Sequence, residues 1–359
     1  MSIKVMVVDD TIFYRKIVGD LLAEIDGVEM VGTANNGKIA LNKIRSLKPD
    51  LLTLDVEMPI MSGLELMEEI NRQDLDVGCI MLSAKTQKGS EATMRALELG
   101  AFDFISKPDN DSAEENIKAI KTELDKLIKG FIRHRRLRGE PGEKPAVPKK
   151  PAVTPRPAKP LKRTEKSLVV ALGISTGGPN SLLQVLPELP GDIGVPILLV
   201  QHMPPIFTAS LAQSLDRKCA LKVKEAEDQE KVEANTVYIA PGGKQMKVAS
   251  GAGGLHRMIR ITDDPPENNC RPSVDYLFRS VAREYGSKAT CVIMTGMGSD
   301  GKQGMSVVKA AGSVGIAQDE TSSVVYGMPK AVVDAGLVDI VASLDSMSQE
   351  ISKTLQWHE

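Results

Sequence analysis

A proline-rich stretch near the middle of the chain constrains the fold most, because it divides the chain into parts that must fold separately. Seven of the twenty residues from Pro141 to Pro160 are proline, mixed with Lys, Arg, Ala and Val in no periodic apolar pattern. Such a composition favours a semi-extended linker. A chain of 359 residues also exceeds one ordinary domain of roughly 100–200 residues. We therefore predict a first domain at residues 1–125, a linker at 126–166 and a second domain at 167–359.

The predicted linker carries a large share of the chain's positive charge. Between Arg133 and Lys166 there are 12 Lys or Arg and 3 Glu, a balance of +9, whereas the whole chain has a net charge of −2. The rest of the chain therefore carries −11, so both domains together are acidic. This balance argues against a nucleic-acid partner. A basic run without interleaved aromatic residues is more typical of a solvated spacer than of a surface for nucleic acid or acidic lipid.

The composition and the N-terminus indicate where the protein is located. Hydrophobic residues make up 42% of the chain and aromatic residues 3%, so we expect cores of aliphatic side chains and methionine. No apolar run approaches the roughly 18 residues that cross a bilayer. Only eight residues precede the pair Asp9-Asp10, too few for a signal peptide, and we expect a cytoplasmic protein without membrane insertion. The cysteines form no CxxC pair and are expected to be reduced and structural: Cys79, Cys219, Cys270 and Cys291.

Both predicted domains alternate short apolar runs with stretches of helical spacing. In the first, five such βα units fit into about 125 residues, with helices predicted at Arg15–Ile25, Gly37–Leu47 and Leu64–Asn71. In the second, helices are predicted at Ile206–Leu215 and Val274–Glu284. This pattern predicts the α/β class, with two doubly wound parallel sheets that bind ligands beyond the carboxyl ends of their strands.

One region of the second domain departs from this pattern. The segments LKVKEAED, VYIAPGG, KQMKVAS and RMIRIT, between Leu221 and Thr262, alternate apolar and polar residues. Alternation is typical of half-buried strands. We therefore expect a region of antiparallel β-hairpins inserted into the parallel sheet.

Chemically competent side chains end several strands of the first domain. Asp9 and Asp10 follow the first strand, Asp55 the third, Ser83 the fourth and Lys107 the fifth. A single Asp at a strand end is often a turn residue or a helix cap. Three carboxylates at one edge would raise one another's pKa unless a hard cation lay among them, and oxygen ligands suit Mg²⁺. The hydroxyl and the ammonium would then face an added anion.

This constellation resembles the receiver domain of two-component response regulators over residues 1–125. The resemblance implies that Asp55 accepts a phosphoryl group from a histidine kinase and that Asp9, Asp10 and Asp55 hold Mg²⁺. The motifs that carry it are Asp9-Asp10, Asp55 within LDVEMP, Ser83-Ala84 and Lys107-Pro108.

The same resemblance implies a switch. Ser83 and Lys107 would contact the phosphoryl oxygens, and Phe104 would be the switching aromatic residue. Ser83 stands where many receivers carry threonine and Phe104 where several carry tyrosine, so the hydroxyl and the ring are both retained. A phosphoryl group adds charge and acceptor oxygens that bias a two-state surface.

A serine in the second domain has the setting of a nucleophile. Ser175 lies in GISTGG between an apolar strand and a helix that opens at Pro179, the context of a nucleophile elbow. Of four histidines, only His202 ends an apolar strand, so it is the candidate base. Asp300, in TGMGSDG, is the candidate that orients the imidazole. The order Ser, His, Asp differs from that of α/β-hydrolases.

The residues alone leave two other interpretations open. Gly296, Gly298 and Gly301 spell G-x-G-x-x-G between a strand and a helix, and Asp319 ends the next strand, a pattern typical of dinucleotide binding. A non-catalytic output module is the third possibility.

Seven motifs between residues 167 and 355 belong together: GISTGGP, LLVQHMPPIFTASLAQSL, KEAEDQE, VYIAPGGKQM, RPSVDYLFRSVA, IMTGMGSDG and VVYGMPKAV. With these motifs, residues 167–355 resemble the catalytic domain of chemotaxis protein-glutamate methylesterases, and with the receiver the arrangement resembles that of the whole response-regulator methylesterase. The resemblance implies a serine hydrolase with Ser175 as nucleophile, His202 as base and Asp300 as orienting carboxylate, with Thr176 and Met297 near the site.

The resemblance also implies a function. The enzyme would demethylate glutamyl methyl esters of chemoreceptors, release methanol and deamidate selected receptor glutamines, with no cofactor for hydrolysis. A chemotaxis histidine kinase would phosphorylate Asp55. The unphosphorylated receiver is expected to cover the active-site mouth, and phosphorylation to weaken that packing.

Overall fold

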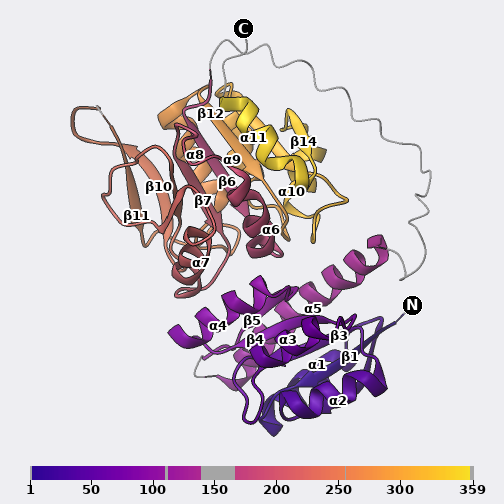
Figure 1. Ribbon diagram of the computed structural model, residues 1–359. Helices are drawn as coiled ribbons and strands as arrows, with labels where there is room; N and C mark the ends of the chain where they lie inside the picture. The colour runs from indigo at the N-terminus through magenta and orange to yellow at the C-terminus, as the bar shows by residue number, and fades with distance from the viewer. Residues whose placement is uncertain (1, 110–111, 139–165, 255, 356–359) are drawn as a thin grey trace, which may run out of the picture. The chain divides into compact units, whose positions relative to one another are not determined.

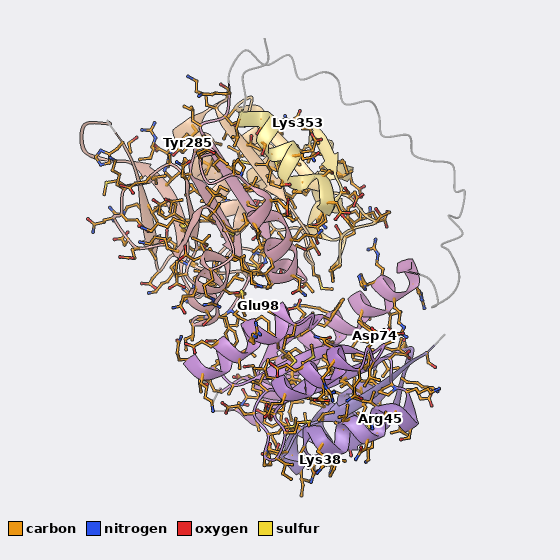
Figure 2. All side chains as sticks on the ribbon, viewed as in Figure 1. Lys38, Arg45, Asp74, Glu98, Tyr285 and Lys353 are labelled. Carbon is orange, nitrogen blue, oxygen red and sulfur yellow. The ribbon has the colours of Figure 1, made fainter. Side chains whose placement is uncertain are left out.

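A computed structural model describes residues 2–109, 112–138, 166–254 and 256–355 (Figure 1). The chain divides into two units, Met1–Arg136 and Leu137–Glu359, each with its own sheet. Most of the predicted linker, residues 139–165, lies outside the described residues. Charged side chains such as those of Lys38, Arg45 and Lys353 lie on the outside of the units (Figure 2). In the described part of the chain, no helix is long and apolar enough to span a bilayer.

The first unit is a five-stranded parallel sheet in the order β2-β1-β3-β4-β5. Helices connect successive strands, as the alternating sequence pattern predicted. The strands are β1 (Ile3–Val8), β2 (Val28–Ala34), β3 (Leu51–Asp55), β4 (Gly78–Ser83) and β5 (Asp103–Ser106). The helices are α1 (Ile12–Ala23), α2 (Gly37–Leu47), α3 (Gly63–Arg72), α4 (Gln87–Glu98) and α5 (Ala113–Arg138).

Side-chain caps fix where these helices begin. The side chains of Thr11, Asn36, Ser62 and Thr86 each accept a hydrogen bond from a backbone N–H of the first helical turn. Such caps satisfy donors that would otherwise lack a partner, and each stabilises a helix by about 1 kcal/mol. At α3 the Glu65 side chain also accepts from the Ser62 backbone, which completes a capping box.

Helix α5 runs beyond residue 125, where we expected the linker to begin, and continues to Arg138. The physical reason is an apolar stripe. Leu127, Ile128 and Phe131 are buried in the core of the first unit together with Leu124, at helical spacing. These side chains pack the helix onto the sheet, so residues 126–136 belong structurally to the first unit.

The second unit is a seven-stranded parallel sheet in the order β14-β13-β12-β6-β7-β9-β8, with a separate two-stranded sheet, β10-β11. The strands are β6 (Val169–Ile174), β7 (Ile197–Gln201), β8 (Lys222–Glu225), β9 (Thr236–Ile239), β10 (Gln245–Ser250), β11 (Arg257–Thr262), β12 (Ala289–Ile293), β13 (Val314–Gln318) and β14 (Ile340–Ala342). The α-helices are α6 (Gly178–Val185), α7 (Phe207–Asp216), α8 (Val274–Tyr285), α9 (Lys302–Ala310), α10 (Met328–Asp334) and α11 (Met347–Leu355).

The expected hairpin region is confirmed in one half and wrong in the other. β10 and β11 form an antiparallel pair, in which Gln245 lies opposite Thr262. β8 and β9 instead run parallel and extend the main sheet. β8 is the edge strand and only one of its four residues, Val223, is buried. The alternation of apolar and polar residues thus correctly predicted that β8 is a half-exposed strand. It carries no information on whether a strand runs parallel or antiparallel to its neighbour.

Each sheet contains an interior strand at which the strand order reverses. In the first unit β1 lies between β2 and β3, and in the second β6 lies between β12 and β7. Connections leave such a strand toward opposite sides, which opens a crevice at its carboxyl end. The strand-end residues singled out in the sequence lie at or after the carboxyl ends of β1, β3, β4 and β5 in the first unit and of β6, β7 and β12 in the second.

Candidate active site

Ser175 lies in the tight turn between β6 and α6. The turn closes with a 2.7 Å hydrogen bond from Gly178 N–H to the Ser175 carbonyl, and Gly177 takes a φ of 74°, which favours glycine. Gly296 approaches from the loop after β12, where an added Cβ would lie 2.7 Å from Ser175 Cβ. The strand–turn–helix context predicted for the serine is confirmed, and its side chain is half-buried.

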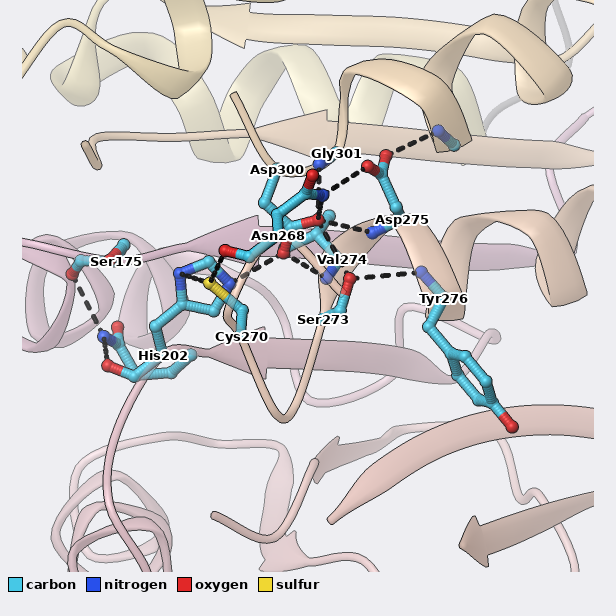
Figure 3. A network of polar contacts seen from close by, with 12 residues as sticks. Ser175, His202, Asn268, Cys270, Ser273, Val274, Asp275, Tyr276, Asp300 and Gly301 are labelled. Carbon is cyan, nitrogen blue, oxygen red and sulfur yellow. Dashed lines mark hydrogen bonds and ion pairs between the residues drawn. The ribbon is translucent and has the colours of Figure 1, made fainter. Parts of the chain in front are cut away.

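His202 follows the neighbouring strand, β7. Ile174 pairs with Gln201 in the sheet, and His202 N–H donates to the Ile174 carbonyl at 3.1 Å, so Ser175 and His202 follow paired residues. The imidazole makes two polar contacts (Figure 3). Nε2 lies 2.9 Å from Asp300 Oδ2, and Nδ1 lies 3.7 Å from Cys270 Sγ. Among the described residues no hydrogen bond joins the Ser175 hydroxyl to this ring.

Asp300 is held at the N-terminus of α8 and is almost fully buried. Its two carboxylate oxygens accept six hydrogen bonds, one of them from the His202 ring. The other five come from the Asn268 amide, the Ser273 hydroxyl and the backbone N–H groups of Val274, Asp275 and Gly301. A helix N-terminus also favours negative charge. This carboxylate is therefore fixed in position and direction.

These contacts set the protonation of the pair. Burial alone would raise the pKa of Asp300, but the hydrogen bond and charge of His202 and the α8 amides lower it to about 2. Burial alone would lower the pKa of His202, but the hydrogen bonds with Asp300 and Cys270 raise it to about 9. Since Asp300 stays ionised, it accepts the hydrogen of Nε2–H. The lone pair of the neutral ring is then on Nδ1.

Thr176 follows Ser175 directly, and Met297 follows Gly296, whose backbone approaches the serine. The Thr176 carbonyl accepts from the Thr295 hydroxyl at 2.9 Å. The loop before Met297 is fixed because the Gly296 carbonyl accepts from two backbone N–H groups of the segment that opens α10. In the described part of the chain, the backbone N–H groups of Thr176 and Met297 donate to no protein acceptor.

The first unit brings its predicted strand-end residues together. Asp9 and Asp55 are buried, Asp10 is exposed, and one oxygen of each carboxylate lies within 4.8 Å of the others. Lys107 Nζ bridges Asp9 Oδ2 and Asp55 Oδ2, each at 2.9 Å. Burial raises the pKa of Asp55 to about 6, and the charges of Asp9 and Asp10 add to this effect against the influence of Lys107.

These residues fit a hard divalent cation. The donor set contains only carboxylate oxygens, and its three carboxylates have one lysine, Lys107, among them. Asp9, Asp10 and Asp55 would hold the ion.

The positions of Ser83 and Phe104 give less direct support for the roles predicted for them. The Ser83 hydroxyl is buried and donates to the Gly89 carbonyl of α4 at 3.0 Å, so a contact with a phosphoryl group on Asp55 would require this bond to change. Phe104 is half-buried on β5. Their roles remain predictions from the sequence.

Comparison with known proteins decides the family. The family model described as CheB methylesterase matches residues 170–351, and the response regulator receiver domain model matches residues 5–119. A protein of Desulfotalea psychrophila, named protein-glutamate methylesterase/protein-glutamine glutaminase, is 53% identical over 99% of both chains. The chain belongs to the CheB methylesterase family. A Bacillus subtilis family member with the same name is 42% identical, again over 99% of both chains.

A solved structure agrees with this family assignment. The crystal structure of the Thermotoga maritima CheB methylesterase catalytic domain is 41% identical, covers 53% of this chain and 99% of its own, and has a TM-score of 0.51. Membership also assigns the glycine-rich loop around Gly298 to a methylesterase domain, and the dinucleotide-binding interpretation is set aside.

Sequence reasoning missed several residues that surround Asp300 in this family member. Asn268 donates to Asp300 Oδ1 at 3.1 Å and to Asp275 Oδ2 at 2.9 Å, and so links the two carboxylates (Figure 3). Burial raises the pKa of Asp275, and so does its neighbour Asp300. Ser273 could have been found, because a serine before a helical stretch is an N-cap signal. Asn268 and Cys270 lie in the irregular segment before α8, where no local pattern indicated a role.

Proposed function

We propose that this chain hydrolyses glutamyl methyl esters of chemoreceptors and deamidates selected glutamines, the activities for which its relatives are named. The observation that carries the proposal is the His202–Asp300 pair beside Ser175, at the carboxyl edge of the sheet in a methylesterase-family domain.

The proposed reaction begins at the serine. His202 Nδ1 takes the proton of the Ser175 hydroxyl while Oγ attacks the ester carbonyl, and the ionised Asp300 stabilises the imidazolium through Nε2–H. The tetrahedral intermediate collapses, the imidazolium gives its proton to the leaving methoxide, and methanol departs. A water deprotonated by the same nitrogen then releases the glutamate from Ser175. With a glutamine substrate, ammonia leaves in place of methanol.

The developing oxyanion needs donors that are free and fixed. The backbone N–H groups of Thr176 and Met297 meet both conditions, because neither donates within the described chain and the loops that carry them are hydrogen-bonded in place. We assign the oxyanion hole to these two groups. Gly296 lets the second loop approach the serine closely.

Regulation belongs to the first domain. A cation held by Asp9, Asp10 and Asp55 would neutralise the incoming phosphoryl group, which Asp55 accepts from a chemotaxis histidine kinase. For a cytoplasmic receiver Mg²⁺ is the expected ion. The charge of phospho-Asp55 draws Lys107 and Ser83 toward it, and Phe104 follows, so that the surface of the receiver changes and the catalytic domain becomes active.

Methanol release from methylated chemoreceptor membranes tests this proposal. Wild type should release methanol, and more of it with a small phosphodonor and Mg²⁺, whereas Ser175→Ala should release none. Ser352→Ala, which changes a serine on α11 whose hydroxyl bonds only within its own helix, is the matched control and should act as wild type. Full turnover by Ser175→Ala would refute the assignment of Ser175 as the nucleophile.

A further inference from the structure

The His202 ring has a second neighbour, Cys270, on the side of Nδ1, opposite the contact with Asp300. Cys270 stands at His202, and the nitrogen, sulfur and oxygen donors of His202, Cys270 and Asp300 lie within 4.8 Å of one another (Figure 3). The thiol is half-buried, unlike Cys79 and Cys291, which are enclosed in the cores. Like Cys79, Cys219 and Cys291, Cys270 is a free cysteine, and its thiol lies 3.7 Å from His202 Nδ1. A mixed set of nitrogen, sulfur and oxygen donors suits zinc and similar transition metals.

The distances favour ligation by two of the three residues. Zinc binds histidine nitrogen at about 2.0–2.1 Å and cysteine sulfur at about 2.3 Å, so a tetrahedral angle separates the two donors by roughly 3.6 Å. His202 Nδ1 and Cys270 Sγ are 3.7 Å apart. Nδ1 is also the nitrogen that carries the lone pair, because Asp300 holds Nε2–H. The feature that prepares His202 as a base also prepares it as a metal ligand.

Asp300 fits a supporting role better than direct ligation. Its oxygens already accept six hydrogen bonds, and direct ligation would break some of them. A carboxylate on the far nitrogen of a metal-bound histidine is a recurrent arrangement that fixes the ring and strengthens the ligand. The charges also balance, since the Asp300 carboxylate and a Cys270 thiolate together offset a divalent cation.

We propose that His202 Nδ1 and Cys270 Sγ form a site for a borderline or soft transition-metal ion, with Zn²⁺ as the representative, and that occupancy inhibits hydrolysis. Binding forms metal–nitrogen and metal–sulfur bonds and releases to solvent the thiol proton and, where the ring is an imidazolium, the proton on Nδ1, while water fills the remaining positions. The ion takes the lone pair that must accept the Ser175 proton. The inhibitory effect, though not the binding itself, rests on the proposed function.

Cobalt absorption tests the binding. Co²⁺ is added to the full chain in excess Mg²⁺, which occupies the acidic site of the receiver. Thiolate-to-cobalt charge transfer should appear in the near ultraviolet, and Zn²⁺ should abolish it. Cys270→Ser should lose this band, and the matched variant Cys219→Ser, which changes the other half-buried thiol, should keep it. A thermal melt shows that both variants are folded.

Inhibition supplies a second readout. Zn²⁺ should suppress methanol release by wild type, and Cys270→Ser should need at least about tenfold more Zn²⁺ for the same effect, since loss of a metal-site group costs 10–100-fold in affinity. A band that persists in Cys270→Ser, or no band in wild type, would overturn the proposal. A Cys270-dependent band in a wild type that releases no methanol would keep the metal site and refute the proposed function instead.

Discussion

Asp55 and Asp300 are both buried aspartates at the carboxyl edge of a parallel sheet, Asp55 at the end of β3 and Asp300 in the loop after β12, yet their chemistry is opposite. Burial raises the pKa of Asp55 to about 6, whereas the pKa of Asp300 is lowered to about 2 despite its burial. Asp300 faces a histidine and five other donors. Asp55 faces two further carboxylates and one lysine. Position in the fold therefore selects the site, and the neighbours select the chemistry.

The difference corresponds to two tasks. A carboxylate that orients a histidine must keep its charge and its direction through a catalytic cycle, and a full set of donors secures both. A carboxylate that accepts a phosphoryl group must present a free oxygen to an incoming ligand. Among the described residues, Asp55 accepts from Lys107 but from no such set of donors, so its carboxylate can take up a cation and a phosphoryl group.

The largest effect should follow from removing the charge of Asp300. Asp300→Asn cannot hold the Nε2–H tautomer of His202, so kcat for methanol release should fall on the order of 10⁴-fold. Asp275→Asn is the matched control, because Asp275 shares the Asn268 link but does not touch His202. Its loss should be far smaller. Equal losses in the two variants would mean that the network is merely structural.

The pH dependence of hydrolysis tests the His202 side of the comparison. The base works only when neutral, so kcat/KM should rise about tenfold per unit as the pH increases toward the His202 pKa of about 9 and level off above it. Because contact with Cys270 helps to raise this pKa, Cys270→Ala should shift the rise to lower pH. A profile that is flat between pH 6 and 9 would contradict this account of the base.

A smaller effect should appear in the stability of the receiver. Since the folded pKa of Asp55 lies above its ordinary value of 3.8, stability falls as the pH rises from about 4 through about 6. In Mg²⁺-free buffer at pH 7, Asp55→Asn should therefore stabilise the receiver by about 2–3 kcal/mol. Urea unfolding measures this gain, which should vanish below pH 4. Asp109→Asn, at an exposed carboxylate, should show no such gain.

The sequence predicted both sheets and the strand ends that carry the sites. It succeeded there because burial makes parallel strands read as apolar runs, and because the strand ends of a doubly wound sheet meet at one edge. The length of α5 was also recoverable, since Leu124, Leu127, Ile128 and Phe131 follow helical spacing. The predicted linker boundary at 125 did not use this signal.

Other features could not be derived from local pattern. The direction of β8 depends on which neighbour it joins, and that pairing is tertiary. The approach of Cys270 to His202, and the bridge that Asn268 makes between Asp275 and Asp300, depend on the path of an irregular segment between β11 and α8. Long-range contacts fix that path, and no periodic pattern of apolar residues in the sequence predicts it.

Covalent labelling tests the central claim, that Asp300 and His202 activate one serine, most directly. The intact protein is treated with a fluorophosphonate, which loses fluoride as a serine oxygen bonds to its phosphorus, and the adduct is mapped by mass spectrometry. The account predicts a single adduct on Ser175 in wild type and almost none in His202→Ala at the same pH. Labelling of another residue, or equally fast labelling of Ser175 in both proteins, would contradict it.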